Sequence, residues 1–284
     1  MTGDILTQIE VKMNSFTKAE KKVAQFIRAN AKEVLYMSIT DLADACKVGD
    51  TSVFRFCKTL ELKGYQEFKL ALAQSSGTDD DSAPQLTGEV HIHDSLEDVA
   101  GKVLATNVSA LNETYALLDM NILSQAIDLM IRSSKMLFVG VGTSSITAME
   151  AKNKFMRITS NADYVSDSHL QSMAAALLTP RDLVVAISYS GSTKDIIQIV
   201  KLARNAGAKV ICITRFAKSP LTANSDITLL CGANEGPLQG GSLSAKLSQL
   251  YLLDILYMEY FKRTFEVSKR NKEITAEAVL DKLY

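Results

Sequence analysis

The chain of 284 residues lacks the features that mark several common classes of protein. Its charges nearly balance, with 31 Lys and Arg against 32 Asp and Glu, so overall charge gives no indication of a nucleic-acid partner. No apolar run approaches the length of a membrane span, and the first residues carry neither a basic nor an apolar signal-peptide region. We therefore expect a cytoplasmic protein with no membrane partner.

Cysteine is scarce, and the sequence has no tryptophan. The spacings of Cys46, Cys57, Cys212 and Cys231 match no zinc or CxxC pattern, and the residues around them are apolar. Buried free thiols in a reducing compartment are therefore the expected state. The chain is 47% hydrophobic and 22% charged, which is enough apolar material for one large or two ordinary folded domains.

Hydroxyl side chains are concentrated in one short segment, Val184–Thr193. An apolar, strand-like run leads into this segment's turn, and the helical pattern Lys194–Leu202 follows at once. The free N–H groups and the positive end of a helix dipole make such a turn an anion site. Gly191 allows close approach of the backbone, and the GxxxxGK[ST] spacing of a nucleotide-binding loop is absent. We predict a site for a small phosphate ester, with hydroxyls supplied by Ser188, Ser190, Ser192 and Thr193.

The same arrangement occurs once more, earlier in the chain. The apolar run Lys135–Val139 is followed by the turn Gly140–Ser145 and by a helical pattern through Met156. Serines at such turns commonly do no more than cap helices. However, four hydroxyls in six residues at the later turn are more than a cap requires, which favours a bound ligand.

These segments resemble the SIS (sugar isomerase) domain over residues 123–260. The matching pieces are Phe138–Ser145, Ala186–Ile196 and Ile211–Leu229. The resemblance implies a flavodoxin-like, three-layer αβα domain with a parallel sheet. It further implies that the SxSGxT turn holds a phosphate and that Glu235 lies near the sugar. The implied phosphosugar ligands are Ser144, Ser145, Ser188, Ser190, Ser192, Thr193 and Glu235.

The region before residue 75 has an all-helical pattern. Thr17 followed by Glu20 predicts a capping box. Thr40 is expected to cap a helix ending at Cys46, and the turn Lys47–Gly49 leads to a second helix over residues 51–60. A glycine-containing turn between two helices is the geometry that places a recognition helix in the DNA major groove. The predicted DNA-binding side chains are Thr51, Ser52, Arg55, Lys58 and Lys63, with Lys47 and Lys69 extending a basic rim.

Charge alone does not predict DNA binding here, because residues 1–75 hold eleven Lys and Arg against nine Asp and Glu. The segment Ser38–Lys69, however, resembles the helix-turn-helix of the RpiR family of bacterial transcription regulators. Arg55, Phe56, Cys57 and Lys58 are among the residues in register with the family pattern, and the resemblance spans nearly the whole chain. Two positions depart from the family pattern: Gly49 stands near the usual turn serine, and Glu61 replaces the usual glycine.

The resemblance implies an all-α helix-turn-helix domain over residues 1–75, a linker over 76–94 and a SIS domain over 95–284. It also implies a transcription regulator without cofactors, in which a phosphorylated sugar controls affinity for double-stranded operator DNA. The regulated genes would serve sugar or amino-sugar catabolism. Symmetric half-sites would require a homodimer or a tetramer.

Two alternatives come from other classes of protein. SIS domains also occur in sugar-phosphate isomerases and lyases, and His169 and Glu235 are candidate acid–base groups. Such enzymes of the arabinose-5-phosphate type lack the N-terminal helix-turn-helix, and a lone histidine at a helix start is more often a hydrogen-bonding residue. We therefore assign no catalytic residue. His91 and His93 have no evident third ligand, so no metal site is expected. A pure interaction module without a ligand is disfavoured by the hydroxyl-rich turn.

Overall fold

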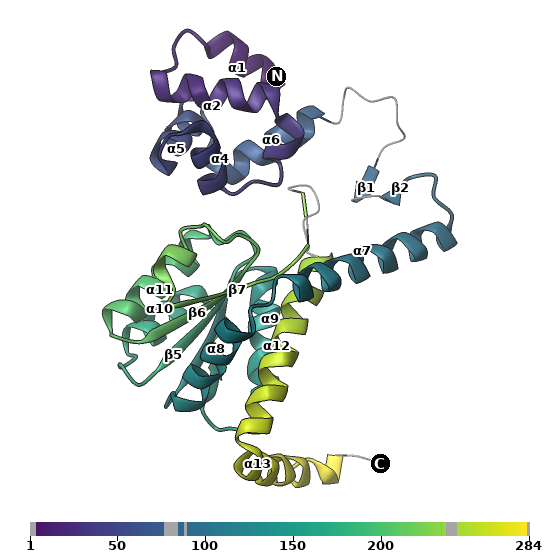
Figure 1. Cartoon of the computed structure of the whole chain (residues 1–284), viewed down its shortest axis with the longest axis vertical. Coiled ribbons are helices and arrows are strands. Elements are labelled where there is room, and N and C mark those ends of the chain that lie inside the picture. The colour runs from purple at the N-terminus through teal and green to yellow at the C-terminus, as the bar shows by residue number, and fades with distance from the viewer. Residues whose placement is uncertain (1–3, 77–84, 88–89, 234, 237–242, 283–284) are drawn as a thin grey trace. The chain divides into compact units, whose positions relative to one another are not determined.

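The computed structural model describes residues 4–76, 85–87, 90–233, 235–236 and 243–282, and these form two compact units (Figure 1). The first unit comprises the chain up to Thr106 together with residues 234–242, and the second comprises Asn107–Ala233 and the chain from Leu243 onward. The boundary between them falls within one helix, α7 (Leu96–Ala116). The first unit begins with helices only, whereas the second is α/β, as the sequence predicts.

The N-terminal region of the first unit is built from short helices packed on one apolar core. Rings of Phe16 and Phe68 lie 5.1 Å and 5.7 Å from the ring of Phe56, which is fully buried. The capping box predicted at Thr17 is present, because Glu20 N–H donates to the Thr17 hydroxyl and the Glu20 carboxylate accepts from Thr17 N–H. The helices are α1 (Ile5–Lys12), α2 (Lys18–Ala29), α3 (Ala31–Val34), α4 (Ile39–Cys46), α5 (Asp50–Thr59) and α6 (Tyr65–Ser76).

The helix pair α4–α5 has the predicted helix-turn-helix arrangement, but the cap of α4 differs from the expectation. Ser38, not Thr40, is the N-cap residue, and with Asp41 three residues later it completes a capping box. The extended conformation of Ser38 starts the helix at residue 39 and leaves the Thr40 hydroxyl to donate to Asp50. Lys47 adopts a left-handed conformation, with φ of 53°, and makes the tight turn between the two helices.

Most of the predicted linker lies outside the described residues. Within it, β1 (Gln85–Thr87) pairs antiparallel with β2 (Val90–His91), and α7 begins soon afterwards. The predicted division at residues 76–94 therefore stays a prediction.

The second unit contains a sheet of five parallel strands in the order β4-β3-β5-β6-β7. Numbered along the chain, this is the order 2-1-3-4-5 of flavodoxin-like sheets. The strands are β3 (Met136–Gly140), β4 (Ala162–Tyr164), β5 (Leu183–Ile187), β6 (Lys209–Thr214) and β7 (Ile227–Leu230). The helices are α8 (Met120–Arg132), α9 (Thr143–Phe155), α10 (Ser168–Ala176), α11 (Lys194–Asn205), α12 (Leu243–Arg263) and α13 (Phe265–Glu277), with 3-10 turns at Thr222–Asn224 and Leu280–Lys282.

Helices cover both faces of this sheet, which confirms the three-layer prediction (Figure 1). Phe138 and Val185 face the layer made by α8, α9 and α12, whereas Leu137 and Val184 face α10 and α11. Every residue of β3 and of β5 is buried, because helices cover both faces of these strands. Strands buried in this way have continuous apolar sequences, as both of these do.

The chain leaves β3 and β5, two adjacent strands, toward opposite faces of the sheet. β3 leads to α9 on one face, and β5 leads to α11 on the other. Such a topological switch point opens a crevice at the carboxyl ends of the strands, where ligands of open α/β sheets bind. The fold therefore places both predicted hydroxyl turns at this switch point.

Candidate functional site

The turn after β5, residues 188–193, is held in place by the chain that follows β6. Gly191 has φ of +59°, and a methyl group there would lie 2.7 Å from the Cβ of Ser219 and 3.1 Å from the Thr214 hydroxyl. The Gly191 carbonyl accepts a hydrogen bond of 2.9 Å from Leu221 N–H. Only glycine fits this position without strain, because both its backbone conformation and the close approach exclude a side chain.

The hydroxyls of this β5 turn have different surroundings. Ser188 is buried, and its hydroxyl makes no hydrogen bond to any residue that the structure describes. Ser190 accepts from Ser192 N–H at 3.2 Å, and the Ser192 hydroxyl donates to the Ser190 carbonyl at 3.2 Å. Thr193 is half-buried beside them. Of these hydroxyl side chains, Ser188 and Thr193 are therefore the two that make no hydrogen bond within the turn.

The two helices that start at the switch point are not capped by side chains. Thr193 is the N-cap residue of α11 and Gly142 that of α9, and neither position supplies a side-chain capping bond. By contrast, Asp119 and Asp167 cap the neighbouring helices α8 and α10 with their carboxylates. Ser145 N–H donates to the Gly142 carbonyl at 3.1 Å, but the other first-turn N–H groups of α9 and α11 have no side-chain cap among the described residues, and with the helix dipoles they favour an anion. Capping alone does not account for the hydroxyl at Thr193.

The turn after β3, residues 140–145, lies next to the β5 turn because Gly140 is paired in register with Ile187. A methyl group at Gly140 would lie 2.7 Å from the Ser144 backbone carbon, so the first turn of α9 passes close to the strand end. The Ser145 hydroxyl donates to the Gly142 carbonyl at 2.6 Å, and Ser144 is half-buried. The structure therefore brings all six predicted hydroxyl residues to one edge of the sheet.

Two other predicted residues are less closely tied to this edge. His169 lies in the first turn of α10, where its side chain is exposed. Glu235 is half-buried in the segment after β7, and that segment groups with the first unit. Its place beside the sugar stays a prediction.

Sequence reasoning missed Gln171, which fixes the β3 turn. Its amide nitrogen donates to the Gly140 carbonyl at 3.0 Å and to the Val165 carbonyl at 2.8 Å, so it joins the ends of β3 and β4. The side chain is fully buried, and its oxygen has no partner among the described residues. No sequence signal indicates this role, because the contact joins a helix to two strand ends that are distant in the chain.

The candidate DNA-binding side chains lie on and just after α5. Thr51, Arg55 and Lys58 are exposed on the helix, Ser52 is half-buried, and Lys63 is exposed beyond its end. The opposite face of α5 is buried in the core through Val53, Phe56 and Cys57, and Leu60, the C-cap residue, is buried with them.

Lys69 does not belong to the basic rim, which corrects the expectation from the sequence. Its side chain is buried: the ammonium donates to the Met37 carbonyl at 3.3 Å and lies 5.3 Å from the centre of the Tyr65 ring. Burial lowers the pKa of Lys69 to about 8. The helical period of α6 turns this residue inward, so proximity in sequence to Lys63 is not proximity on the surface.

Glu61, the departure from the family pattern, is paired within the helical region. The Lys12 ammonium donates to its carboxylate at 2.8 Å and also to the Thr59 carbonyl at 2.9 Å. The hydrogen bond from Lys12 lowers the pKa of Glu61. Glu61 has φ of 66°, the left-handed conformation that glycine adopts most easily, which explains why glycine is the usual residue there.

All four cysteines are buried free thiols, as predicted, and burial raises the pKa of Cys57 to about 12. Among the described residues, no group of three His, Cys, Asp or Glu side chains is arranged to hold a metal ion. No described helix is long and apolar enough to cross a membrane.

A helix-turn-helix region joined to a doubly wound α/β unit with two hydroxyl turns at its switch point defines a class, the DNA-binding regulators with a small-ligand domain. The model of the "Helix-turn-helix domain, rpiR family" matches residues 3–79, and that of the "SIS domain" matches residues 129–259. The chain belongs to the RpiR family of helix-turn-helix transcriptional regulators with a SIS domain.

Relatives match over nearly their whole length. An uncharacterized HTH-type transcriptional regulator of Haemophilus influenzae is 32% identical over 99% of this chain and 98% of its own length. The HTH-type transcriptional regulator HexR of Pseudomonas aeruginosa is 33% identical over 89% of this chain and 87% of its own. The structure of the Vibrio vulnificus NanR protein complexed with ManNAc-6P superimposes with a TM-score of 0.86, at 30% identity over 98% of this chain and 99% of that one. The relatives of Haemophilus influenzae and Pseudomonas aeruginosa are both named as transcriptional regulators, which favours a regulator over the isomerase alternative.

Proposed function

We propose that a phosphorylated sugar binds at the switch point of the SIS domain and controls the affinity of the protein for operator DNA. The observation that carries this proposal is the pair of helices, α9 and α11, whose N-termini are uncapped and lined by hydroxyls at adjacent strand ends. The phosphate accepts hydrogen bonds from these N–H groups and hydroxyls. The proposed ligand residues are Ser144, Ser145, Ser188, Ser190, Ser192, Thr193 and Glu235.

An amino-sugar phosphate is the proposed effector. The NanR relative was solved as a complex with ManNAc-6P, and it resembles this chain over its whole length. We therefore take ManNAc-6P as the first probe, and we propose that the regulated genes serve sugar or amino-sugar catabolism in the cytoplasm.

The proposed DNA contacts are made by α5 and the chain after it. Thr51, Ser52, Arg55, Lys58 and Lys63 can donate to phosphates and base edges in the major groove. We propose that the active form is a homodimer or a tetramer, because a two-fold assembly reads symmetric half-sites. An exposed apolar stripe on and just after α10 supports self-association; it consists of Leu170, Met173 and Leu177.

Fluorescence anisotropy of the intergenic DNA upstream of the gene tests the proposal, with sugar phosphates added at one fixed salt concentration. Salt is fixed because phosphate contacts make affinity steeply salt-dependent. The double variant Ser188→Ala/Ser190→Ala is expected to abolish the sugar response and leave DNA binding intact. Arg55→Ala is expected to weaken specific DNA binding by about 5- to 150-fold, as for loss of one good base contact, and to leave sugar binding intact.

Matched controls make this comparison sharp. Ser160→Ala removes an exposed hydroxyl at the opposite end of the sheet, before β4, and Lys18→Ala removes an exposed charge from α2. Ser160→Ala is expected to keep the wild-type sugar response, and Lys18→Ala is expected to keep wild-type DNA binding. Equal loss of both activities in the Ser188/Ser190 and Arg55 variants would contradict separate sites. If wild type binds no DNA specifically with any ligand, the helix-turn-helix is a packing element, and the same sugars should be tested for isomerisation.

A further inference from the structure

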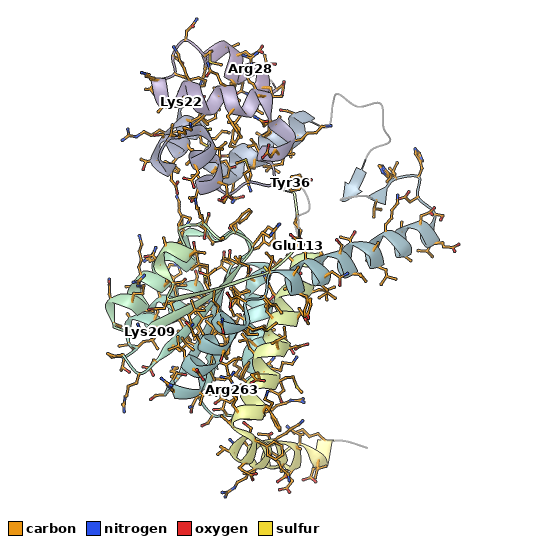
Figure 2. All side chains as sticks on the ribbon, viewed as in Figure 1. Lys22, Arg28, Tyr36, Glu113, Lys209 and Arg263 are labelled. Carbon is orange, nitrogen blue, oxygen red and sulfur yellow. The ribbon has the colours of Figure 1, made fainter. Side chains whose placement is uncertain are left out.

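A closed ring of hydrogen bonds joins the β5 turn to α7. The Tyr189 carbonyl accepts from Arg215 N–H at 3.1 Å, and the Arg215 guanidinium donates to Glu113 Oε1 at 2.7 Å. Glu113 Oε2 accepts from Ala233 N–H at 3.0 Å, and the Ala233 carbonyl accepts from the Tyr189 hydroxyl at 2.9 Å. Glu113, on α7, is labelled in Figure 2. Four residues that are distant in sequence therefore close one circuit.

The members of this ring come from four different parts of the second unit. Tyr189 lies between Ser188 and Ser190, so its backbone cannot stay fixed if those serines move. Arg215 follows β6 directly, Ala233 follows β7, and Glu113 comes from α7. The ring thus ties the turn after β5 to the chain after two further strands and to a helix outside the sheet.

Close packing around the ring makes it sensitive to small displacements. Gly232 N–H donates to the Thr114 hydroxyl at 2.9 Å, and a methyl group at Gly232 would lie 2.7 Å from the Glu113 Cβ. Ala233 has φ of 110°, a conformation that non-glycine residues adopt only where the surroundings impose it. The side chains of Arg215 and Glu113 are only 21% and 34% exposed, so their charge-assisted bond is partly shielded from water.

We propose that Tyr189, Glu113 and Arg215 are positioning residues that transmit occupancy of the β5 turn to α7. This inference rests on the proposed function. A ligand shifts an equilibrium only if it interacts differently with the two states, and displacement of the Tyr189 carbonyl and hydroxyl supplies that difference. α7 is one continuous helix, and the boundary between the two units falls between Thr106 and Asn107. A change at Glu113 therefore acts on a helix whose N-terminal part, up to Thr106, belongs to the first unit.

Tyr189→Phe and Glu113→Gln test the ring with minimal change of volume. The first removes the bond to the Ala233 carbonyl, and the second removes the charge that holds Arg215. The measurements are the affinity for ManNAc-6P by calorimetry and the ratio of DNA affinities without and with saturating ManNAc-6P. We expect this ratio to move at least fivefold closer to one in each variant, while affinity for ManNAc-6P changes less than threefold. Purely structural damage would lower both together.

Two controls and a double variant complete the experiment. Tyr115→Phe on α7 and Glu150→Gln on α9 change exposed side chains outside the ring, and both should keep the wild-type ratio. Because either substitution alone opens the ring of hydrogen bonds, the double variant Tyr189→Phe/Glu113→Gln should lose no more coupling than either single variant. Arg215→Gln, which keeps the backbone N–H and removes the charge that pairs with Glu113, replaces a single variant that fails to fold, and the same loss of coupling is expected.

Each remaining outcome has a distinct meaning. A wild-type ratio in all the ring variants, or an additive loss in the double variant, would overturn the ring as a relay while leaving the proposed function intact. A sugar affinity that falls in parallel with the ratio would also overturn it. If wild-type protein binds ManNAc-6P and DNA but shows a ratio of one, the proposed function itself fails.

Discussion

Replacement of Gly191 by alanine should damage the β5 turn through two separate costs. Placing an L-residue at φ of +59° costs about 1–2 kcal/mol. The new methyl group, 2.7 Å from the Ser219 Cβ and 3.1 Å from the Thr214 hydroxyl, overpacks a tight site and adds about 1–3 kcal/mol. The expected destabilisation of the α/β unit is therefore about 2–5 kcal/mol, with loss of sugar-phosphate binding because the turn must shift.

Scanning calorimetry measures this effect, and a double-mutant cycle separates the two costs. Ser219→Gly removes the atoms that the methyl group meets first, so Gly191→Ala should cost only about 1–2 kcal/mol in that background. Gly49→Ala is a control without close packing, because Gly49 has φ of −87° and open space around it, and as the N-cap of α5 it should cost only the capping preference of glycine over alanine, about 1 kcal/mol or less. A Gly191→Ala protein within about 0.5 kcal/mol of wild type would refute the close-packing argument, since that is the range of innocuous surface changes. An equal cost in both backgrounds would assign the whole effect to the backbone.

Three further predictions concern the first unit and the thiols. Lys69, with a folded pKa of about 8 against about 10.4 unfolded, binds its proton less well when folded, so stability should rise with pH between these values. Lys69→Met should remove this pH dependence and, at pH 7, a penalty of up to about 3 kcal/mol, as denaturant titrations across that range will show. Glu61→Gly should raise both the melting temperature and DNA affinity, because it relieves a positive φ and removes a negative charge; a lower melting temperature would contradict this. A thiol reagent should label none of the four cysteines in the native protein and all four in denaturant, and rapid native labelling of Cys57 would show that its burial is wrong.

The layers of the fold are predictable because the sequence shows both the apolar runs of buried strands and the helical spacing of apolar residues. The strands β3 and β5 are uninterrupted apolar runs, and each ends in a turn rich in glycine and hydroxyls. The parallel sheet that brings these turns together follows from the resemblance to the SIS domain. The core face of α5 follows from Val53, Phe56 and Cys57 at helical spacing, and all three are buried. Local pattern is sufficient where a residue's partner is the hydrophobic core as a whole.

Local pattern is insufficient where a specific partner decides the outcome. Thr40 and Ser38 are both acceptable caps, and Ser38 takes the role because Asp41 lies at the third helical position from it. Lysine is usually found on the surface, yet the Met37 carbonyl and the Tyr65 ring accept the Lys69 ammonium inside the helical region. These outcomes depend on contacts between elements, and such contacts have no signature in a single sequence.

The proposed ring around Glu113 can produce a response of the size that is typical of coupled sites. Couplings between sites are typically about 1–3 kcal/mol, which corresponds to a change of about 5- to 150-fold in affinity. One hydrogen bond to a charged group contributes about 1.5–3 kcal/mol. Loss or gain of the single bond between Arg215 and Glu113 therefore covers most of the range of a typical response, and no rearrangement of the sheet is needed. In the proposed relay, the sheet can stay rigid while the protein responds, because the responding element is a polar ring beside the carboxyl ends of the strands.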